Sequence, residues 1–251
     1  MTANSAFSLD EKTILITGAS SGIGRATALK CAVYGANLIL LSRNEQKLQV
    51  LLKEIGGDKH QVLQADLSDS TEIEKVVEQC KALDGIVHCA GIVEPYPVGY
   101  LNRQKVDTTF AVNFYAPVQL TSLLLKKKKI NRSGSIVFIS SIASQNPFIG
   151  GSTYSASKAA LEAFARTVAI ESAAKLIRAN CLSPALVKTP IFEEMSQNIA
   201  ADTMDDHLKK YPLGMGEPDD VAHAAIFLLS DASKWITGIN IRMDGGLLIA
   251  S

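Results

Sequence analysis

Short runs of apolar residues alternate along this chain with longer segments of helical periodicity, and few folds accommodate such an order. We expect strands over residues 13–17, 37–41, 62–64, 85–88, 136–139, 178–182 and 239–243. We expect helices over residues 23–34, 45–55, 71–82, 105–128, 153–175 and 218–230. A run that is apolar at every position is typical of a strand buried on both faces, as in parallel sheets. The sequence therefore predicts an α/β chain with a doubly wound, seven-stranded parallel sheet and helices on both faces.

The length of 251 residues suits one α/β domain over residues 1–251. The strand–helix alternation breaks over residues 183–212, which contain three prolines and scattered apolar residues. An irregular segment of that length within a domain is usually functional. We therefore interpret residues 185–212 as a substrate lid.

Charge and composition limit the classes of molecule that the chain is expected to bind. Lysine plus arginine and aspartate plus glutamate number 25 each, so no net field favours nucleic acid or a membrane surface as a partner. No signal peptide or membrane-length apolar run is visible. The histidines show no ligand-like spacing, so we expect no metal site. The cysteines form no CxxC pair and are expected to be free thiols in a cytoplasmic protein; they are Cys31, Cys80, Cys89 and Cys181.

A glycine-rich loop joins the first expected strand to the first expected helix, and it reads Thr17-Gly18-Ala19-Ser20-Ser21-Gly22-Ile23-Gly24. Backbone can approach a pyrophosphate only where no Cβ intervenes, and the N-terminus of a helix offers free N–H groups. The loop therefore predicts a dinucleotide site, with a plain strand–helix turn as the alternative. The expected cofactor-binding residues are Gly18, Ser20, Ser21, Gly22, Ile23 and Gly24.

The end of the second expected strand bears on the choice of cofactor. An NAD site usually carries an acidic residue there, whereas this chain has Ser42 and Arg43. Ser42 can donate a hydrogen bond to a 2′-phosphate, and Arg43 can form an ion pair with it. We therefore predict NADP(H), with a structural loop role for Arg43 as the alternative. Asp66, after the third strand, would accept a hydrogen bond from adenine or would cap a helix.

A phenol and an ammonium lie four residues apart in the segment Tyr154-Ser155-Ala156-Ser157-Lys158. In a helix this spacing places Tyr154 and Lys158 on one face. A nearby cation favours the phenolate and lowers the pKa of a tyrosine, so the pair is a candidate acid/base. Such pairs often lie on solvated helix faces without function. Here the glycine loop and Ser140-Ser141 precede the pair and favour the catalytic interpretation.

Together these motifs resemble the short-chain dehydrogenase/reductase family over nearly the whole chain. The matching residues are Thr17-Gly18-x-x-x-Gly22-x-Gly24, Asp66-Leu67, Ala90-Gly91, Asn113, Ser141, Tyr154-x-x-x-Lys158, Ser183-Pro184, Thr189, Gly238 and Asp244-Gly245-Gly246. The resemblance implies a single-domain Rossmann fold and a homotetramer or homodimer. It also implies further cofactor contacts from Leu67, Cys89, Ala90, Gly91, Pro184, Ala185, Val187 and Thr189, besides Tyr154 and Lys158.

The resemblance implies a role for each of four catalytic residues. Tyr154 would be the general acid in reduction and the base in oxidation, and Lys158 would bind the nicotinamide ribose and lower the Tyr154 pKa. Ser141 would hydrogen-bond the substrate oxygen. Asn113 would hold a water for a proton relay to Lys158. Structural alternatives are that Ser141 caps a strand end and that Asn113 bonds backbone groups.

Three positions depart from the family pattern. Cys89 replaces an asparagine, and Ala185 replaces a glycine. Ser21 stands where many NADP-dependent members have a basic residue, so affinity for the 2′-phosphate would depend chiefly on Arg43.

The substrate is expected to be an uncharged or moderately apolar ketone, or the corresponding alcohol. The predicted pocket residues are Ser141, Ile142, Ala143, Phe148, Ile149, Leu186 and Phe192. An acyl thioester is the alternative, because the chain also resembles 3-oxoacyl-(acyl carrier protein) reductases and has Arg132 and Lys175 near their basic carrier-docking positions. Residues 126–129, all lysine, are interpreted as a solvated helix end, with docking of an acidic carrier protein as the alternative. A catalytically silent NADP sensor would normally have lost one of the catalytic residues.

Overall fold

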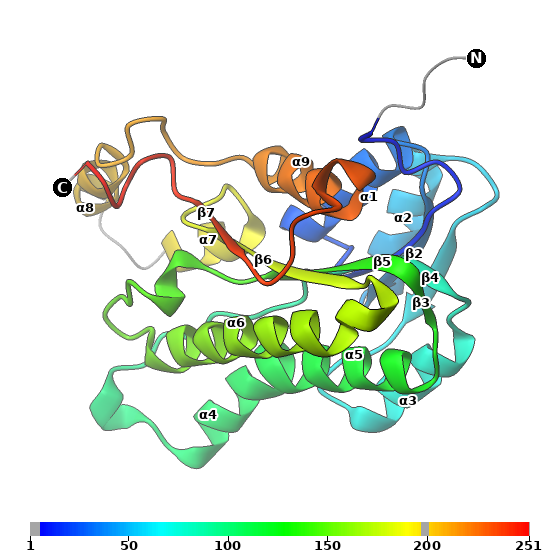
Figure 1. The fold of residues 1–251 in the computed structure, drawn as a ribbon. Coiled ribbons are helices and arrows are strands. Elements are labelled where there is room, and N and C mark those ends of the chain that lie inside the picture. The colour runs from blue at the N-terminus through cyan, green and yellow to red at the C-terminus, as the bar shows by residue number, and fades with distance from the viewer. Residues whose placement is uncertain (1–5, 197–200, 251) are drawn as a thin grey trace.

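Seven parallel strands form one sheet, as predicted, and their order in the sheet is β3-β2-β1-β4-β5-β6-β7 (Figure 1). This computed structural model describes residues 6–196 and 201–250. The strands are β1 (Thr13–Thr17), β2 (Asn37–Ser42), β3 (Gln61–Gln64), β4 (Leu83–His88), β5 (Ile130–Ile139), β6 (Arg178–Pro184) and β7 (Asn240–Met243). The strand order reverses between β1 and β4, and open α/β sheets bind ligands at such a reversal.

Helices cover both faces of the sheet (Figure 1). They are α1 (Gly22–Val33), α2 (Glu45–Ile55), α3 (Ser70–Gln79), α4 (Arg103–Phe110), α5 (Ala116–Lys126), α6 (Ser152–Ser172), α7 (Pro190–Ser196), α8 (Ala201–Leu208) and α9 (Pro218–Leu229). Helix α1 packs against α9 on one face, and α3 packs against α5 on the other. No helix in the described part of the chain is long and apolar enough to cross a bilayer.

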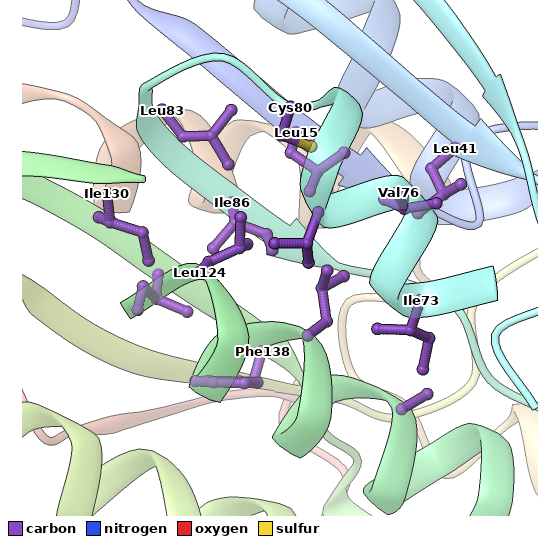
Figure 2. Packing of buried hydrophobic residues seen from close by; sticks show 14 of the residues in the cluster. Leu15, Leu41, Ile73, Val76, Cys80, Leu83, Ile86, Leu124, Ile130 and Phe138 are labelled. Carbon is purple, nitrogen blue, oxygen red and sulfur yellow. The ribbon is translucent and has the colours of Figure 1, made fainter. Parts of the chain in front are cut away.

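Strand β1 shows why its sequence is apolar at consecutive positions. Leu15 belongs to the core beneath α3, α5 and α6, which Figure 2 shows with Ile86 and Phe138. Ile14 and Ile16 point the other way, into the core beneath α1, α2 and α9. Each side of the strand thus buries apolar surface, which is the main source of its stability.

Two expected elements differ from the structure. The helix predicted over residues 105–128 is interrupted by a π-helical turn at Ala111–Tyr115, between α4 and α5. The segment 183–212 is not irregular throughout, because it contains α7 and α8. Residues 197–200 of the predicted lid lie outside the described residues.

The lysines at the end of α5 are not a uniformly solvated helix end. The Lys129 ammonium donates to three backbone carbonyls at the end of α3, those of Val77, Glu78 and Cys80, at 2.6–2.9 Å. A cation is favoured at these carbonyls by the helix dipole. Lys127 also forms an ion pair with Glu78. Two of the lysines therefore hold α5 against α3.

The four cysteines are free thiols, as predicted. Cys31, Cys80 and Cys181 are buried and Cys89 is half-buried. Burial raises the pKa of each thiol, to about 11 for Cys80 and about 12 for Cys89 and Cys181. The thiolate is the reactive form, so these raised values make the cysteines unreactive at neutral pH.

His88 is a buried histidine at the end of β4. Its ring stacks on Phe138 with centroids 4.8 Å apart, and its Nε2 lies 3.0 Å from Thr121 Oγ1. Burial lowers the pKa of His88 from 6.5 to about 3. The unfolded chain therefore takes up this proton at a higher pH than the folded chain. The stability that His88 contributes is complete above pH 6.5 and decreases as the pH falls toward 3.

We predict that His88→Asn flattens the acid side of the stability profile. One group of this kind lowers the free energy of unfolding by at most about 1.4 kcal/mol per pH unit. Urea unfolding at several pH values between 6 and 4 would measure the slope in both proteins. Parallel slopes would contradict the prediction, whereas a lower but flatter profile in the variant would agree with it.

Candidate active site

Most of the predicted site segments lie at or just after the carboxyl end of a strand, so the parallel sheet brings them to one edge. The glycine loop follows β1, Ser42 ends β2 with Arg43 directly after it, and Asp66 follows β3. Residues 89–91 follow β4, Ser141 follows β5, and residues 184–189 follow or end β6. Tyr154 and Lys158 lie in the first two turns of α6, next to the end of β5.

The loops after β1 and β4 approach each other closely. Gly18 has a φ of +65°, and a Cβ on it would lie 2.9 Å from the Ala90 backbone. A Cβ on Gly24 would lie 2.3 Å from the Gly18 carbonyl oxygen. Thr17 Oγ1 accepts hydrogen bonds from the backbone N–H groups of Cys89 and Ala90, both at 3.1 Å. The glycines and the Thr17 hydroxyl thus hold the two turns together.

The N-terminus of α1 fits an anionic group. Its N-cap residue Ser21 makes no capping hydrogen bond with its side chain, and the first turn contains no acidic residue. The first N–H groups of the helix are therefore not capped by Ser21, and the dipole end is not neutralised. Together with the absent side chains of Gly18 and Gly22, this arrangement fits the pyrophosphate of a dinucleotide.

A surface hollow of about 550 Å³ lies at the end of β2. It is lined by Arg43, Asn44, Glu45, Gln46 and Gln64. Arg43 is exposed, but Ser42 is buried and its Oγ accepts a hydrogen bond from Asn44 N–H at 3.2 Å. Sequence reasoning missed Glu45, whose carboxylate shares the hollow with Arg43. Glu45 would oppose a second negative charge there.

Asp66 does not cap α3, because Asp69 is its N-cap residue and accepts from Thr71 N–H. Asp66 Oδ1 accepts instead from the backbone N–H and the hydroxyl of Ser68, at 2.9 and 2.8 Å. These hydrogen bonds, the backbone one first, lower the pKa of the Asp66 carboxyl. Leu67, the next predicted cofactor residue, is buried.

Ser141, just after the carboxyl end of β5, and Tyr154, in the first turn of α6, are brought together. Ser141 Oγ accepts from Ala143 N–H at 3.1 Å and so caps a short 3-10 turn at Ile142–Ser144. Burial raises the pKa of the Tyr154 phenol, and a hydrogen bond with Ser141 lowers it by less. The net shift is opposite to the lowering expected from Lys158. Desolvation of the phenolate sets the direction of the shift, and Lys158, whose Nζ is 5.6 Å from the ring centroid, does not reverse it.

Lys158 is a buried cation beside Tyr154. Its Nζ donates to the Ile139 carbonyl at 2.7 Å. Burial lowers the pKa of Lys158 to about 8. A Cβ on Gly91 would lie 3.5 Å from this Nζ and 3.3 Å from Asn113 Oδ1, so these three residues adjoin.

Asn113 lies in the π-helical turn, a feature that is frequent at functional sites. Its Oδ1 accepts from Ile92 N–H, and its Nδ2 donates to the Ile92 carbonyl, both at 2.9 Å. Nδ2 also donates to Ser157 Oγ at 3.2 Å. The Asn113 amide thus forms hydrogen bonds with backbone groups, which is the structural role given above as the alternative. Its role in a water relay stays a prediction.

The predicted substrate residues are only partly assembled. The Phe148 ring lies 6.3 Å from the Tyr154 ring, and a Cβ on Gly151 would overlap it at 2.6 Å. Leu186 and Phe192 are half-buried on the segment after β6. Ile149, which is also predicted to line the pocket, is 98% exposed.

Sequence reasoning named Thr17 only as part of the glycine loop, and it missed two other residues that shape the site. Thr17 ends β1 and bonds the turn after β4, and Gly151 makes room for Phe148. Glu162, buried in α6, accepts hydrogen bonds from three serine hydroxyls. Its spacing of four residues after Lys158 was a signal, since it predicts the same helical face.

Comparison with known proteins assigns the chain to a family. A family model described as enoyl-(acyl carrier protein) reductase matches residues 18–248. The chain is 35% identical over 246 residues to L-xylulose reductase from Caenorhabditis elegans, covering 96% of this chain and 97% of the relative. It is also 35% identical over 248 residues to 3-oxoacyl-[acyl-carrier-protein] reductase FabG from Thermotoga maritima, covering 96% and 99%.

A solved structure agrees with this assignment. A putative NAD(P)-dependent gluconate 5-dehydrogenase from Beutenbergia cavernae, with NADP bound at low occupancy, superposes with a TM-score of 0.88 at 29% identity. The match covers 98% of this chain and 100% of that chain. These matches agree with the sheet order, the glycine loop and the Ser141–Tyr154–Lys158 site. They show that the chain belongs to the short-chain dehydrogenase/reductase family, whose members are oxidoreductases acting on carbonyl or alcohol groups.

Proposed function

We propose that this protein is an NADP(H)-dependent reductase of ketones, which oxidises secondary alcohols in the reverse direction. The convergence of the Ser141 and Tyr154 hydroxyls beside the buried Lys158 carries the proposal. The two hydroxyls are donors that can be aimed at one substrate oxygen. They lie at the same sheet edge as the glycine loop.

The proposed chemistry divides between the cofactor and the chain. A bound nicotinamide would exchange a hydride with the substrate carbon. The hydroxyls of Ser141 and Tyr154 stabilise the charge that develops on the substrate oxygen. Tyr154 donates its proton to that oxygen in reduction and accepts it in oxidation. The raised pKa of Tyr154 keeps the phenol protonated at neutral pH, which suits its role as the acid.

We infer that Lys158 and Asn113 support the proton transfer. The Lys158 ammonium would hold the hydroxyls of the nicotinamide ribose and favour the phenolate once Tyr154 has given up its proton. Asn113 adjoins Lys158 through Gly91 and would hold a water molecule for a proton relay. Both groups are buried, so their interactions are little screened by solvent.

NADP(H) is the proposed cofactor because of the charge at the end of β2. The exposed guanidinium of Arg43 opens onto the hollow there and can pair with a 2′-phosphate. Glu45 opposes this preference from the same hollow. The Beutenbergia cavernae protein is described with bound NADP.

The segment 185–212 is the proposed substrate lid. Its base is closed by backbone pairing, in which Lys188 N–H donates to the Gly216 carbonyl at 3.0 Å and Gly216 N–H donates to the Leu186 carbonyl at 3.2 Å. Helix α7 with Phe192 follows directly. A loop segment whose two ends are paired with each other can move as a unit, and active-site lids close over substrates in this way.

Reduction of a 3-oxoacyl group on an acyl carrier protein is a second candidate. Arg132 donates to the Ala174 carbonyl at 3.4 Å, so it lies beside Lys175 and forms a basic patch with it. This patch is at the C-terminal end of α6, about 30 Å along the helix axis from Tyr154. A carrier docked there would have to bridge that distance. A silent NADP sensor is disfavoured because Ser141, Tyr154 and Lys158 are all present and adjacent.

We also propose a homo-oligomer, a tetramer or a dimer. Small residues on a helix allow close packing against a second copy, but Ala165 and Ala169 of α6 belong to the core and are not available for it. Better support comes from Tyr115, Ile170 and Trp235, which are 52%, 78% and 97% exposed. Sedimentation equilibrium giving a mass of 26.9 kDa would exclude the proposal.

The reaction is tested by following the absorbance of NADPH and NADH against diketones, aldoses, steroids and 3-oxoacyl thioesters. We expect turnover of uncharged ketones with NADPH. Preferential turnover of the thioesters would favour the acyl-reductase alternative. Binding of NADPH without turnover of any class would count against the proposal and in favour of the sensor.

Tyr154→Phe is expected to lower kcat by at least about 100-fold, because it removes the general acid. The dissociation constant for NADPH should change little, since the ring and its packing on Phe148 are kept. Cofactor fluorescence measures binding, and initial rates measure turnover. A Phe variant with near-normal kcat would exclude Tyr154 as the acid.

Replacing Ser42 with Asp and Arg43 with Leu should shift preference from NADPH toward NADH. A charge-assisted contact contributes about 1.5–3 kcal/mol, so the ratio of kcat/KM values should change by roughly 10-fold or more. Glu45→Gln is the opposing variant, and we expect it to strengthen the preference for NADPH. An unchanged ratio in the double variant would remove Arg43 from the phosphate site.

A further inference from the structure

Glu162 is a buried carboxylate that the proposed reaction does not use. It lies in α6 one turn after Lys158 and is 5% exposed. A single oxygen, Oε1, accepts hydrogen bonds from the hydroxyls of Ser140, Ser144 and Ser183 at 2.7, 2.6 and 3.1 Å. The two shorter distances are those of charge-assisted O–H···O⁻ bonds.

The three serines come from three different segments at the active-site edge. Ser140 follows the end of β5, Ser144 ends the 3-10 turn that Ser141 caps, and Ser183 lies near the end of β6. One carboxylate oxygen therefore ties these segments to α6. The segments would otherwise be joined mainly by the sheet and by loops.

Each of the three segments carries or adjoins a residue of the proposed reaction. Ser140 directly precedes Ser141, and its hydroxyl also lies 3.3 Å from the Lys158 carbonyl oxygen. Ser183 directly precedes Pro184, whose carbonyl accepts from Ser141 Oγ at 3.4 Å. The Glu162 network thus reaches Ser141 from two sides and is anchored on the helix that carries Tyr154 and Lys158.

A buried carboxylate is costly to keep for stability alone. Removing a charge from water costs several kcal/mol, and apolar replacements of buried ionic groups are often neutral or stabilising. Such a group instead fixes geometry, because several donors must point at one oxygen. A displacement of about 1 Å in an active site can lower the rate by about 100-fold.

We propose that Glu162 is a positioning residue that fixes the Ser141 hydroxyl relative to Tyr154 and Lys158, through Ser140, Ser144 and Ser183. The expected effect of Glu162 on the reaction rate depends on the proposed carbonyl reduction. Its expected effect on the geometry of residues 140–145 does not depend on that reaction. Glu162 itself touches neither substrate nor cofactor in this role.

The test compares Glu162→Gln, Ser144→Ala and a control, Glu171→Gln. Glu171 is an exposed glutamate near the end of the same helix, so the control makes the same change of charge outside the network. Five quantities are measured in each protein: the melting temperature, the dissociation constant for NADPH, kcat for the best ketone, KM for that ketone, and hydrogen exchange. Exchange is followed by mass spectrometry in peptides covering residues 140–145 and 183–187.

We expect Glu162→Gln to lower kcat by about 10- to 100-fold, because the hydroxyl of Ser141 loses its fixed position. NADPH affinity and KM should change little. Exchange should become faster in the 140–145 and 183–187 peptides and stay unchanged over the glycine loop. Ser144→Ala should have the same effects with smaller magnitude. It still tests the proposal if Glu162→Gln does not fold. The control should behave as the natural protein does.

Two results would overturn the positioning role. One is a folded Glu162→Gln with unchanged kcat and unchanged exchange at residues 140–145. The other is a loss of rate that only follows a loss of NADPH affinity or of melting temperature. If the natural protein turns over no ketone, the proposed function fails, and the exchange measurement still decides whether Glu162 holds the segment.

Discussion

The close approach of the turns after β1 and β4 is the constraint on which the cofactor side of the structure depends. Gly18 and Ala90 come so near that no Cβ fits between them, and the Thr17 hydroxyl accepts N–H donors from the opposite turn. These contacts arise because β1 and β4 are neighbours at the point where the strand order reverses. The N-terminus of α1 then faces the crevice with its first N–H groups uncapped by Ser21.

The catalytic side depends on buried polar groups that are each satisfied. Asn113 joins the turn after β4 to α6, Lys158 bonds the end of β5, and Glu162 gathers three serines from β5, the following turn and β6. Polar groups in a poorly solvated region are costly unless every partner is in place, so they specify one arrangement. The same lack of solvent moves the pKa of Tyr154 up and that of Lys158 down.

Features with local causes were predicted well. The strands were located to within a few residues, except that β5 begins six residues earlier than expected, at Ile130. The errors have tertiary causes. Lys129 looked like a solvated helix residue, yet it caps α3, which is distant in sequence. The direction of the Tyr154 pKa shift depends on burial, which spacing along a helix does not reveal.

By itself, the sequence determined the alternation of strands and helices, the glycine loop after β1, and the shared helical face of Tyr154 and Lys158. Each of these follows from residue type and from spacing within a short stretch of chain. Only the tertiary structure decided that Ser141 meets Tyr154, that Gly91 abuts Asn113 and Lys158, and that Glu162 receives hydroxyls from three segments. Those contacts join residues far apart in the chain, and their geometry is set by packing of the whole sheet against its helices.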